Sequence, residues 1–469
     1  MKFKAAVKGT GFAAVVLAAG KGTRFKSDRP KVMHEILGKP LVYYPVRLAL
    51  EAGAGHVVCV VDGESAQVRD WLEKEFGGRV SCAVQKERLG TAHALHCAAG
   101  AVPPGAGRVL VLYGADPMMT RTTIDSLIAA GGTADLAFTT ATLENPSGYG
   151  RVIRKNRVVT AIVEDRDATA AQKKISEINA GIYIMAAGLV DGLLGKVGNK
   201  NAQKEYYLTD LVGWAVKNRL KVGAVPITDA EELVGVNDRA ELAVCARAMS
   251  LRINSAHMKN GVTIAAPDCT WIGPEVTIGR DTVIMPGCVI LGKTAIGTGA
   301  TIQAHSAIRS CVVGDGAHIR EFCHLEDSEA GPGTIVGPFA RMRPGSVMDE
   351  GAHIGNFVEL KKTHLGVRSK ANHLTYLGDS EIGADVNVGA GTITCNYDGV
   401  NKFRTVLGDG VFVGSDTQFV APVTVGRGAY IGAGSTITKD VPAGALALSR
   451  VPQHVIPGGA KRKAAKKGC

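Results

Sequence analysis

The stretch WIGPEVTIGRDTVIMPGCVILGKTAIGTGATIQAHSAI, residues 271–308, has an isoleucine at every sixth position. The repeated residues are Ile272, Ile278, Ile284, Ile290, Ile296, Ile302 and Ile308. An α-helix repeats every 3.6 residues and a strand every two, so neither element by itself explains a period of six. This period is typical of a parallel β-helix, in which short strands stack rung upon rung. We therefore predict a solenoid in this part of the chain.

The six-residue spacing returns near the C-terminus, which extends the predicted solenoid over nearly half of the chain. The later repeats are Leu407, Val413, Phe419, Val425, Ile431 and Ile437. Glycine follows many repeat positions, as in Ile272-Gly273, and the missing Cβ lets the chain turn a corner. β-Branched side chains suit the narrow interior of such a coil. We expect the coil to begin near residue 261 and to end at about Pro442.

Length and composition indicate a globular protein with more than one domain. The 469 residues exceed what one hydrophobic core usually serves, and 46% of them are hydrophobic. The ten cysteines show neither C-x-x-C pairs nor a metal-ligand spacing, so we expect free thiols and a cytoplasmic location. An apolar run at 12–19 mimics a signal peptide, but it leads directly into a glycine-rich loop. No stretch reaches the roughly 18 apolar residues of a membrane span, so we expect none.

The net charge of +11 is concentrated toward the C-terminal end. Five positive residues fall within the last nine positions: Lys461, Arg462, Lys463, Lys466 and Lys467. We interpret this segment as a solvated tail, with contact to a nucleic acid or a membrane as the alternative. The mildly basic remainder suits anionic, phosphorylated substrates, and we expect no nucleic-acid partner.

The first half of the chain alternates short apolar segments with helical ones, the first helix being opened by Pro45. The predicted strands are Ala13–Leu17, His56–Val61, Val80–Val84 and Val109–Tyr113. Such alternation implies an α/β domain with a Rossmann-like, mostly parallel sheet, which binds ligands at the carboxyl ends of its strands. A long helical pattern at 237–260 follows. We therefore expect domains at 1–239 and 261–469 and a helical linker at 240–260.

A glycine-rich loop directly follows the first predicted strand, with the sequence LAAGKGTR at 17–24. Small residues let backbone N–H groups approach phosphate oxygens, and Lys21 and Arg24 add positive charge. Lys31 offers a further cation after Pro30. The loop matches neither G-x-x-x-x-G-K-[ST] nor G-x-G-x-x-G, so a plain tight turn is the alternative at this point.

The longer segment LAAGKGTRFKSDRPKV, residues 17–32, resembles the signature of sugar-1-phosphate nucleotidyltransferases. Further matching motifs are Gln85 with LGTAHA at 89–94, YG at 113–114, GYGR at 148–151, IVE at 162–164, NAG at 179–181 and GVN at 235–237. With the solenoid attached, the chain resembles the bifunctional enzymes that join an N-acetylglucosamine-1-phosphate uridylyltransferase to a glucosamine-1-phosphate acetyltransferase. The resemblance implies a left-handed coil, UTP and acetyl-CoA as co-substrates, Mg²⁺ as cofactor, and a homotrimer with its acetyl-transfer site between subunits.

The resemblance also implies roles for residues of the first site. It places Arg24 and Lys31 at the triphosphate. The residues that it places around the nucleotide are Leu17, Ala18, Ala19, Gly20, Lys31, Gln85, Gly90, Thr91, Tyr113 and Gly114. The residues that it places around the sugar are Gly150, Glu164 and Asn179, and Asn237 belongs to the combined nucleotide and sugar set. In the implied reaction a sugar-phosphate oxygen attacks the α-phosphorus of UTP and pyrophosphate leaves. This chemistry depends on positioning and charge neutralisation rather than on a covalent intermediate.

One departure from the family pattern concerns the metal. The related enzymes have Tyr-Gly-Asp, whose aspartate binds Mg²⁺ together with an asparagine that corresponds to Asn237. This chain has YGAD at 113–116, so the carboxylate comes one residue late. Because the strand ends before Pro117 and the backbone can bend there, we predict that Asp116 and Asn237 bind the metal. The alternative is a loop carboxylate beside a weakened first site.

Polar residues interrupt the six-residue rhythm in the middle of the solenoid, where NHLTYLGD at 372–379 resembles the acetyltransferase signature. Attack of an amine on a thioester needs a general base that works near neutral pH, and the resemblance gives this role to His373. It implies that the amino-sugar phosphate is held by Arg343, Lys361, Tyr376 and Asn387. It places around acetyl-CoA the residues Ala390, Asn396, Tyr397, Ser415, Ala433 and Arg450. Cys395 is an alternative nucleophile, although direct transfer needs no covalent step.

Two other functional classes compete with a bifunctional transferase. In a single-activity nucleotidyltransferase the solenoid would serve only assembly or regulation, which leaves His373, Tyr376 and Arg450 unexplained. A non-enzymatic scaffold would leave the glycine-rich loop and Lys31 unexplained. Release of coenzyme A thiol in the presence of glucosamine-1-phosphate, together with release of pyrophosphate from UTP, separates the three.

Overall fold

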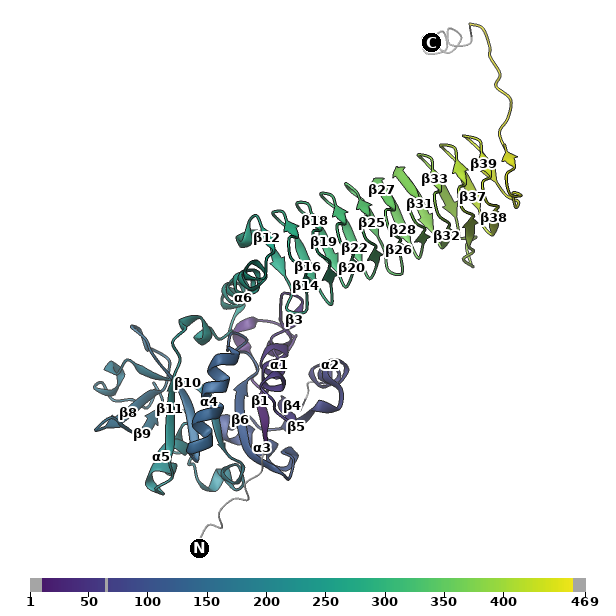
Figure 1. Ribbon diagram of the computed structural model, residues 1–469. Helices are drawn as coiled ribbons and strands as arrows, with labels where there is room; N and C mark the ends of the chain where they lie inside the picture. The colour runs from purple at the N-terminus through teal and green to yellow at the C-terminus, as the bar shows by residue number, and fades with distance from the viewer. Residues whose placement is uncertain (1–10, 64–65, 459–469) are drawn as a thin grey trace, which may run out of the picture. The chain divides into compact units, whose positions relative to one another are not determined.

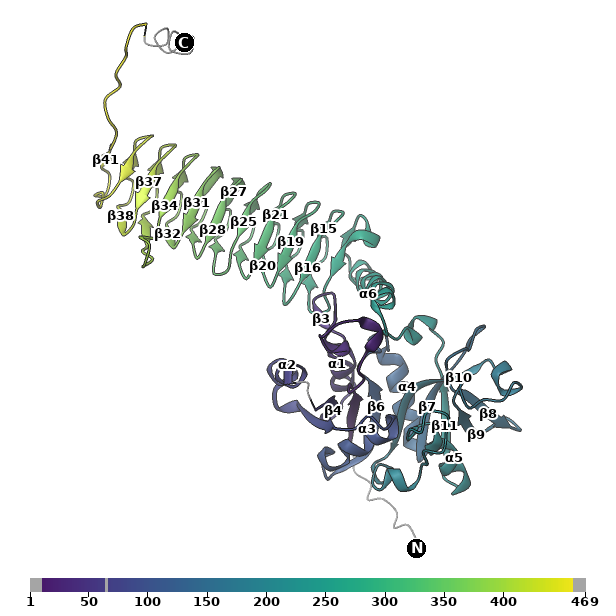
Figure 2. The same ribbon diagram turned by 180° about the vertical axis from the view of Figure 1, so that it is seen from behind.

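The structure, a computed structural model, describes residues 11–63 and 66–458 (Figures 1 and 2). The basic segment from Lys461 to Lys467 lies outside the described residues. The chain divides into two compact units, with the boundary between Met249 and Ser250. The first unit is an α/β domain and the second is a β-helix, and each has its own hydrophobic core.

The first unit is built around one mixed sheet with the strand order β11-β7-β10-β6-β1-β4-β5. These strands are β1 (Gly11–Leu17), β4 (Val57–Asp62), β5 (Val80–Gln85), β6 (Ala106–Tyr113), β7 (Leu136–Thr142), β10 (Glu177–Ala186) and β11 (Val222–Pro226). The pairs β1–β4, β1–β6, β4–β5 and β11–β7 are parallel, as the sequence predicts, whereas β10 runs antiparallel to both β6 and β7. A hairpin of β8 (Arg151–Lys155) and β9 (Val158–Val163) joins the sheet through β10. The carboxyl ends of β1, β4, β5 and β6 therefore share one edge.

Helices cover both faces of this sheet because its strands are apolar on both sides. In β1, Ala14 and Val16 face one core cluster, while Val15 and Leu17 face the other. The first cluster includes residues of α1 (Tyr43–Glu51), α2 (Ala66–Phe76) and α4 (Arg121–Thr133). The second includes residues of α3 (Thr91–Ala98) and α5 (Asp210–Lys217). Strands buried on both faces are typical of parallel α/β sheets.

The last helix, α6 (Arg239–Lys259), spans the unit boundary and closes the first turn of the coil. Its Ser250 Oγ donates a hydrogen bond of 2.9 Å to the carbonyl of Thr270, and Asn254 Nδ2 donates one of 2.8 Å to the same oxygen. A backbone carbonyl at the end of the β-helix thereby obtains partners that a preceding rung would otherwise supply. The polar residues Ser250 and Asn254 are buried for this reason.

The second unit is a coil whose rungs stack along one axis, so that their strands form three parallel sheets (Figure 1). The sheets run from β12 (Thr263–Ile264) to β41 (Leu446–Ala447), from β13 (Trp271–Ile272) to β40 (Thr436–Ile437), and from β14 (Thr277–Ile278) to β38 (Val423–Val425). Most paired residues lie 18 or 17 positions apart, as Val283 with Thr301 and Ala295 with Val312, but an inserted segment raises the separation to 25 between Ser380 and Thr405. Most of the repeated isoleucines fill the interior, as predicted.

The coil continues beyond the predicted end at Pro442. Strand β41 pairs in parallel with β39 (Tyr430–Ile431), but its Leu446 is 63% exposed. A terminal strand lacks a following rung and shows no regular apolar pattern, which explains why the sequence did not reveal it.

One corner of the coil carries large side chains instead of the glycine that a tight turn favours. His305, Phe322, Phe339 and Phe357 all have positive φ, between 55° and 59°. Their rings stack with centroid separations of 5.3, 5.1 and 5.5 Å. We infer that stacking between successive rungs offsets part of the strain of the left-handed backbone conformation.

Two candidate active sites

A cavity of about 320 Å³ lies at the shared edge of the first sheet, where β1, β5 and β6 end. Its walls contain most residues predicted to surround a nucleotide: Leu17, Ala18, Ala19, Gly20, Lys31, Gln85, Gly90, Thr91, Tyr113 and Asn237. The sequence did not single out Arg88 and Glu205, which also line it. Both come from loops whose position depends on the tertiary fold.

The glycine-rich loop is held in place from both sides. On one side Ala18 N donates to Val60 O at 2.8 Å, and Arg88 Nε donates to Ala19 O at 3.1 Å. On the other side Gly22 has a φ of +60°, and a Cβ there would lie 2.5 Å from Cβ of Lys31. Glycine at this position therefore lets the stem of Lys31 lie against the loop. The loop is not a plain turn, because it presents backbone and a cation to a cavity.

A second cavity, of about 710 Å³, adjoins the first. Tyr113, Asp116 and Asn237 line both cavities, so these residues form a shared wall. The second cavity is also lined by Arg24 and Asn179, by Tyr149 and Gly235 of the quoted motifs, and by Glu241, which sequence reasoning did not select. The structure thus places Arg24 at the second cavity and Lys31 at the first.

Three predicted residues, Gly114, Gly150 and Glu164, do not line either of these two cavities. Gly114 N donates to Leu17 O at 2.9 Å, and a Cβ at Gly114 would lie 3.0 Å from Cβ of Ala18. Gly150 O accepts from Asn179 N at 2.8 Å, and Glu164 Oε1 accepts from Thr209 Oγ1 at 2.9 Å. Burial raises the pKa of Glu164, although the bond from Thr209 opposes the shift.

The shared wall brings a carboxylate and a cation together. Lys31 Nζ donates to Asn237 Oδ1 at 2.9 Å. Burial lowers the pKa of Lys31, and the nearby charge of Asp116 opposes this shift. Burial raises the pKa of Asp116 to about 6, and the charge of Lys31 opposes that shift in turn. A protein cation thus binds one predicted metal ligand and interacts with the charge of the other, so this place favours positive charge.

The late carboxylate does point toward the cavities. Ala115 O accepts a hydrogen bond of 3.0 Å from Val236 N, and a Cβ at Gly235 would lie 2.9 Å from Oδ1 of Asp116. Gly235 therefore makes room for the carboxylate. The described residues contain no group of three His, Cys, Asp or Glu side chains that fits a metal ion. One carboxylate and one amide oxygen do suit Mg²⁺, which commonly completes its shell with phosphate oxygens and water.

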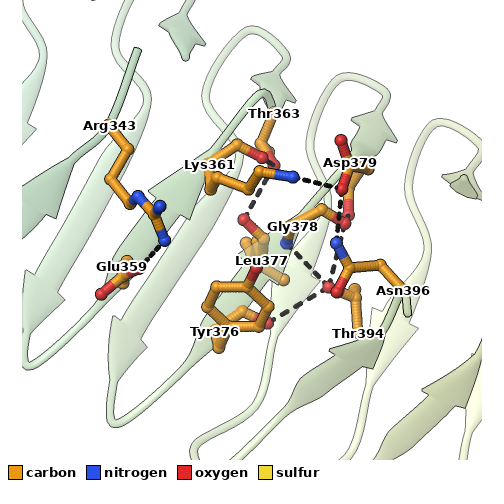
Figure 3. Close-up of polar contacts among 11 residues, drawn as sticks. Arg343, Glu359, Lys361, Thr363, Tyr376, Leu377, Gly378, Asp379, Thr394 and Asn396 are labelled. Carbon is orange, nitrogen blue, oxygen red and sulfur yellow. Dashed lines mark hydrogen bonds and ion pairs between the residues drawn. The ribbon is translucent and has the colours of Figure 1, made fainter. Parts of the chain in front are cut away.

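The candidate site on the coil gathers polar side chains from successive rungs of the second sheet (Figure 3). Lys361, at the end of β28 (Glu359–Lys361), donates to Asp379 Oδ2 at 2.6 Å, and Asn396 Nδ2 donates to the same oxygen. Burial would raise the pKa of Asp379, but these hydrogen bonds outweigh it and leave the pKa below its usual value. In the same sheet Arg343 Nη1 donates to Glu359 Oε1 at 3.1 Å.

Two neighbours of this cluster complete it. Tyr376 begins β31 (Tyr376–Gly378), and a Cβ at Gly378 would lie 2.7 Å from Cζ of its ring. Lys402 was not predicted; the charge of Lys361 is the main cause that lowers its pKa, so the two ammonium groups lie close. Neighbouring cations of this kind suit a phosphate group.

His373 lies at the end of β30 (Lys370–His373), in the first sheet of the coil. Its Nδ1 lies 2.9 Å from Oδ1 of Asn356, its register partner in β27 (His353–Asn356). The amide oxygen only accepts, so in the neutral ring Nδ1 carries the proton and Nε2 keeps a lone pair. His373 also lines a cavity of about 310 Å³ together with Arg320, Phe339 and His353.

The remaining predicted residues lie farther along the coil. Asn387 pairs with Lys370 in the first sheet. Ala390 O accepts from Asp416 N at 2.7 Å, Ser415 O from Gly434 N at 2.8 Å, and Ala433 O from Arg450 Nη1 at 2.8 Å. Tyr397 is 59% exposed in a hairpin closed by its bridge to Lys402. None of these residues lines the described cavity beside His373.

Comparison with known proteins links both units to transferases. The nucleotidyl transferase family matches residues 13–231, and the bacterial transferase hexapeptide (six repeats) family matches 275–310 and 404–439. The two hexapeptide matches flank the rungs that carry Lys361, His373 and Asn396. The hexapeptide match agrees with the predicted left-handed coil.

Curated relatives match nearly the whole chain. A "Bifunctional protein GlmU" of Pelobacter propionicus is 50% identical over 444 residues, which cover 94% of this chain and 96% of that protein. A protein of the same name from Syntrophotalea carbinolica is 50% identical over 446 residues, with coverages of 95% and 96%. Another from Trichlorobacter lovleyi is 47% identical over 444 residues, with coverages of 94% and 96%. Within residues 11–63 and 66–458, no helix has the length and apolar character needed to cross a membrane.

Proposed function

Because this chain belongs to the family of the bifunctional GlmU proteins, we propose that it catalyses two consecutive transfers at two separate sites. It acetylates glucosamine-1-phosphate with acetyl-CoA, and it then transfers UMP from UTP to N-acetylglucosamine-1-phosphate. We assign uridylyl transfer to residues 1–239 and acetyl transfer to 261–469. The observation that carries the first assignment is the wall of Tyr113, Asp116 and Asn237 between two adjoining cavities.

Uridylyl transfer needs the nucleotide and the sugar phosphate next to each other, one in each cavity, where the two cavities meet at these three residues. The first cavity holds UTP against the glycine-rich loop and Lys31, and the second holds N-acetylglucosamine-1-phosphate near Asn179. The phosphate oxygen of the sugar attacks the α-phosphorus, a new P–O bond forms, and the bond to pyrophosphate breaks. The two phosphates repel each other because both are negatively charged. Lys31 at the first cavity and Arg24 at the second neutralise part of this charge.

Asp116 and Asn237 are the proposed ligands of a divalent cation, which we take to be Mg²⁺. When bound, this ion supplies charge neutralisation at the phosphates. The support is the position of both side chains on the shared wall and the presence of the Lys31 ammonium beside them. The carboxylate that comes one residue late in the sequence thus binds the ion from the segment that follows the turn after β6.

Acetyl transfer needs a neutral amine and a group that accepts its proton. Asn356 fixes His373 in the tautomer whose Nε2 lone pair is available. The amine nitrogen attacks the thioester carbonyl carbon, Nε2 takes the amine proton, and the C–S bond breaks to release coenzyme A. Arg343, Lys361 and Tyr376 hold the sugar phosphate. Cys395 has no part in this direct transfer.

We further propose that the protein is a homotrimer in the cytoplasm. The residues assigned to acetyl-CoA do not line the described cavity beside His373, which supports a site completed by a neighbouring subunit. The nine cysteines of the described residues form no disulfide bonds, which suits a reducing compartment. Light scattering at micromolar concentration should give about three times the chain mass of 48.9 kDa, and a monomer would contradict the shared site.

The decisive experiment assays both half-reactions on the purified chain. Coenzyme A thiol should appear only with glucosamine-1-phosphate, and pyrophosphate should appear only with UTP and N-acetylglucosamine-1-phosphate. Pyrophosphate release without thiol release would instead indicate a single-activity nucleotidyltransferase. Neither release would indicate a non-enzymatic scaffold.

A further inference from the structure

The amide of Gln85 has a fixed orientation at the wall of the first cavity. Gln85 is buried, and its Nε2 donates to Gly90 O at 3.3 Å. A carbonyl oxygen only accepts hydrogen bonds, so the nitrogen side of the amide must face Gly90. The oxygen Oε1 is then the part of the side chain left for a ligand, since it has no hydrogen-bond partner among the described residues.

His93 holds this orientation from behind the cavity wall. Its Nδ1 lies 3.0 Å from Nε2 of Gln85. Since Nε2 is a donor, Nδ1 acts as the acceptor, and the neutral imidazole carries its proton on its own Nε2. His93 lies on α3 and does not line the cavity itself. Both N–H groups of the Gln85 amide are thereby used, one by Gly90 and one by His93.

We propose that His93 is a positioning residue that sets which pyrimidine base the nucleotide site accepts. This inference rests on the nucleotide site proposed above. The free Oε1 of Gln85 accepts a hydrogen bond from N3–H of uracil or thymine. Cytosine presents an unprotonated N3 there, and two acceptors facing each other in a buried site are unfavourable. Without His93 the amide keeps only its bond to Gly90 O, so less energy opposes the turned orientation that places Nε2 in the cavity and accepts cytosine.

The experiment measures the ratio of kcat/KM for UTP to kcat/KM for CTP, with N-acetylglucosamine-1-phosphate as acceptor. His93→Leu removes the acceptor atom Nδ1, and His93→Gln places its side-chain oxygen near the former position of the ring Nε2 instead. Both should lower the ratio by about tenfold or more, the usual worth of a lost buried hydrogen bond. His93→Asn, whose Oδ1 occupies the place of Nδ1, should keep the ratio within about threefold of the parent.

Cys97→Ala is the matched control, because Cys97 touches the His93 ring at 4.0 Å from the same helix but lies outside the hydrogen bonds of Gln85. Its ratio should equal that of the parent. Dissociation constants of UTP and CTP for the same proteins give a second readout where turnover is too low. Unchanged ratios in both His93→Leu and His93→Gln would overturn the role of His93 alone. A parent chain that uses neither nucleotide would instead overturn the proposed uridylyl transfer.

Discussion

The two sites are built from the sequence in opposite ways. At the first site the wall joins residues that are far apart in the chain, since the hydrogen bond from Lys31 to Asn237 spans 206 positions. At the second site the bonded pairs follow the rung length, with Lys361 and Asp379 separated by 18 positions and Asp379 and Asn396 by 17. At the first site a loop can therefore supply a metal-binding residue from a position one residue later in the sequence. At the second site the register of the sheet fixes which residues form hydrogen bonds with each other.

The sharpest test of this separation is removal of the proposed base of the coil. His373→Ala should lower acetyl transfer by about 10²–10⁴-fold, the usual contribution of a general base. Uridylyl transfer should be unchanged, because His373 belongs to the other unit. His324→Ala, which removes another exposed histidine of the coil, is the control and should retain both activities. Equal loss of both activities in His373→Ala would indicate a structural histidine.

The second test concerns the displaced carboxylate of the first site. Asp116→Ala should lower magnesium-dependent uridylyl transfer by about 10²–10³-fold, because charge neutralisation by a bound cation contributes several kcal/mol. Acetyl transfer should survive. The exposed Asp70→Ala serves as the matched control. If Asp116→Ala is harmless and the double variant Ala115→Asp, Asp116→Ala raises the rate, then the register position matters and Asp116 is not the ligand.

The third test uses the raised pKa of the same carboxylate. Burial, opposed by the charge of Lys31, raises the pKa of Asp116 to about 6. Above that pH the group is ionised and free to bind a cation, and below it a proton competes. The apparent affinity for Mg²⁺ should therefore fall about tenfold for each pH unit below 6. A magnesium titration at pH 7.5 and pH 5 measures this change, with free Mg²⁺ corrected for binding to UTP. Equal affinities at the two pH values would contradict ligation by Asp116.

The smallest effect is expected from a single methyl group at the second site. In Gly378→Ala the new Cβ would lie 2.7 Å from Cζ of Tyr376, so the ring must move. We expect the KM for glucosamine-1-phosphate to rise a few-fold with little change in kcat, because Tyr376 is assigned to substrate binding. The uridylyl rate is the internal control. A KM equal to that of the parent would remove Tyr376 from the binding site.

The sequence predicted the coil better than it predicted the contents of either site. The isoleucine repeat reports directly on a periodic interior, so the sheets follow from it, but the corner phenylalanines do not, because their stacking links different rungs. Motifs located most of the nucleotide cavity. They did not reveal Arg88, Glu205 or Lys402, whose positions depend on tertiary contacts rather than on neighbours in the chain.

The stacked rungs of the coil set fixed spacings between the side chains that they carry. Lys361, Asp379 and Asn396 end or follow strands of three successive rungs, and neighbouring strands in a sheet lie about 4.8 Å apart. The separation of functional groups along the coil can thus change only by whole rungs, and a deletion of one rung would remove one member of the set. Finer adjustment to a longer or shorter substrate is left to segments that leave the coil, such as the hairpin between Tyr397 and Lys402.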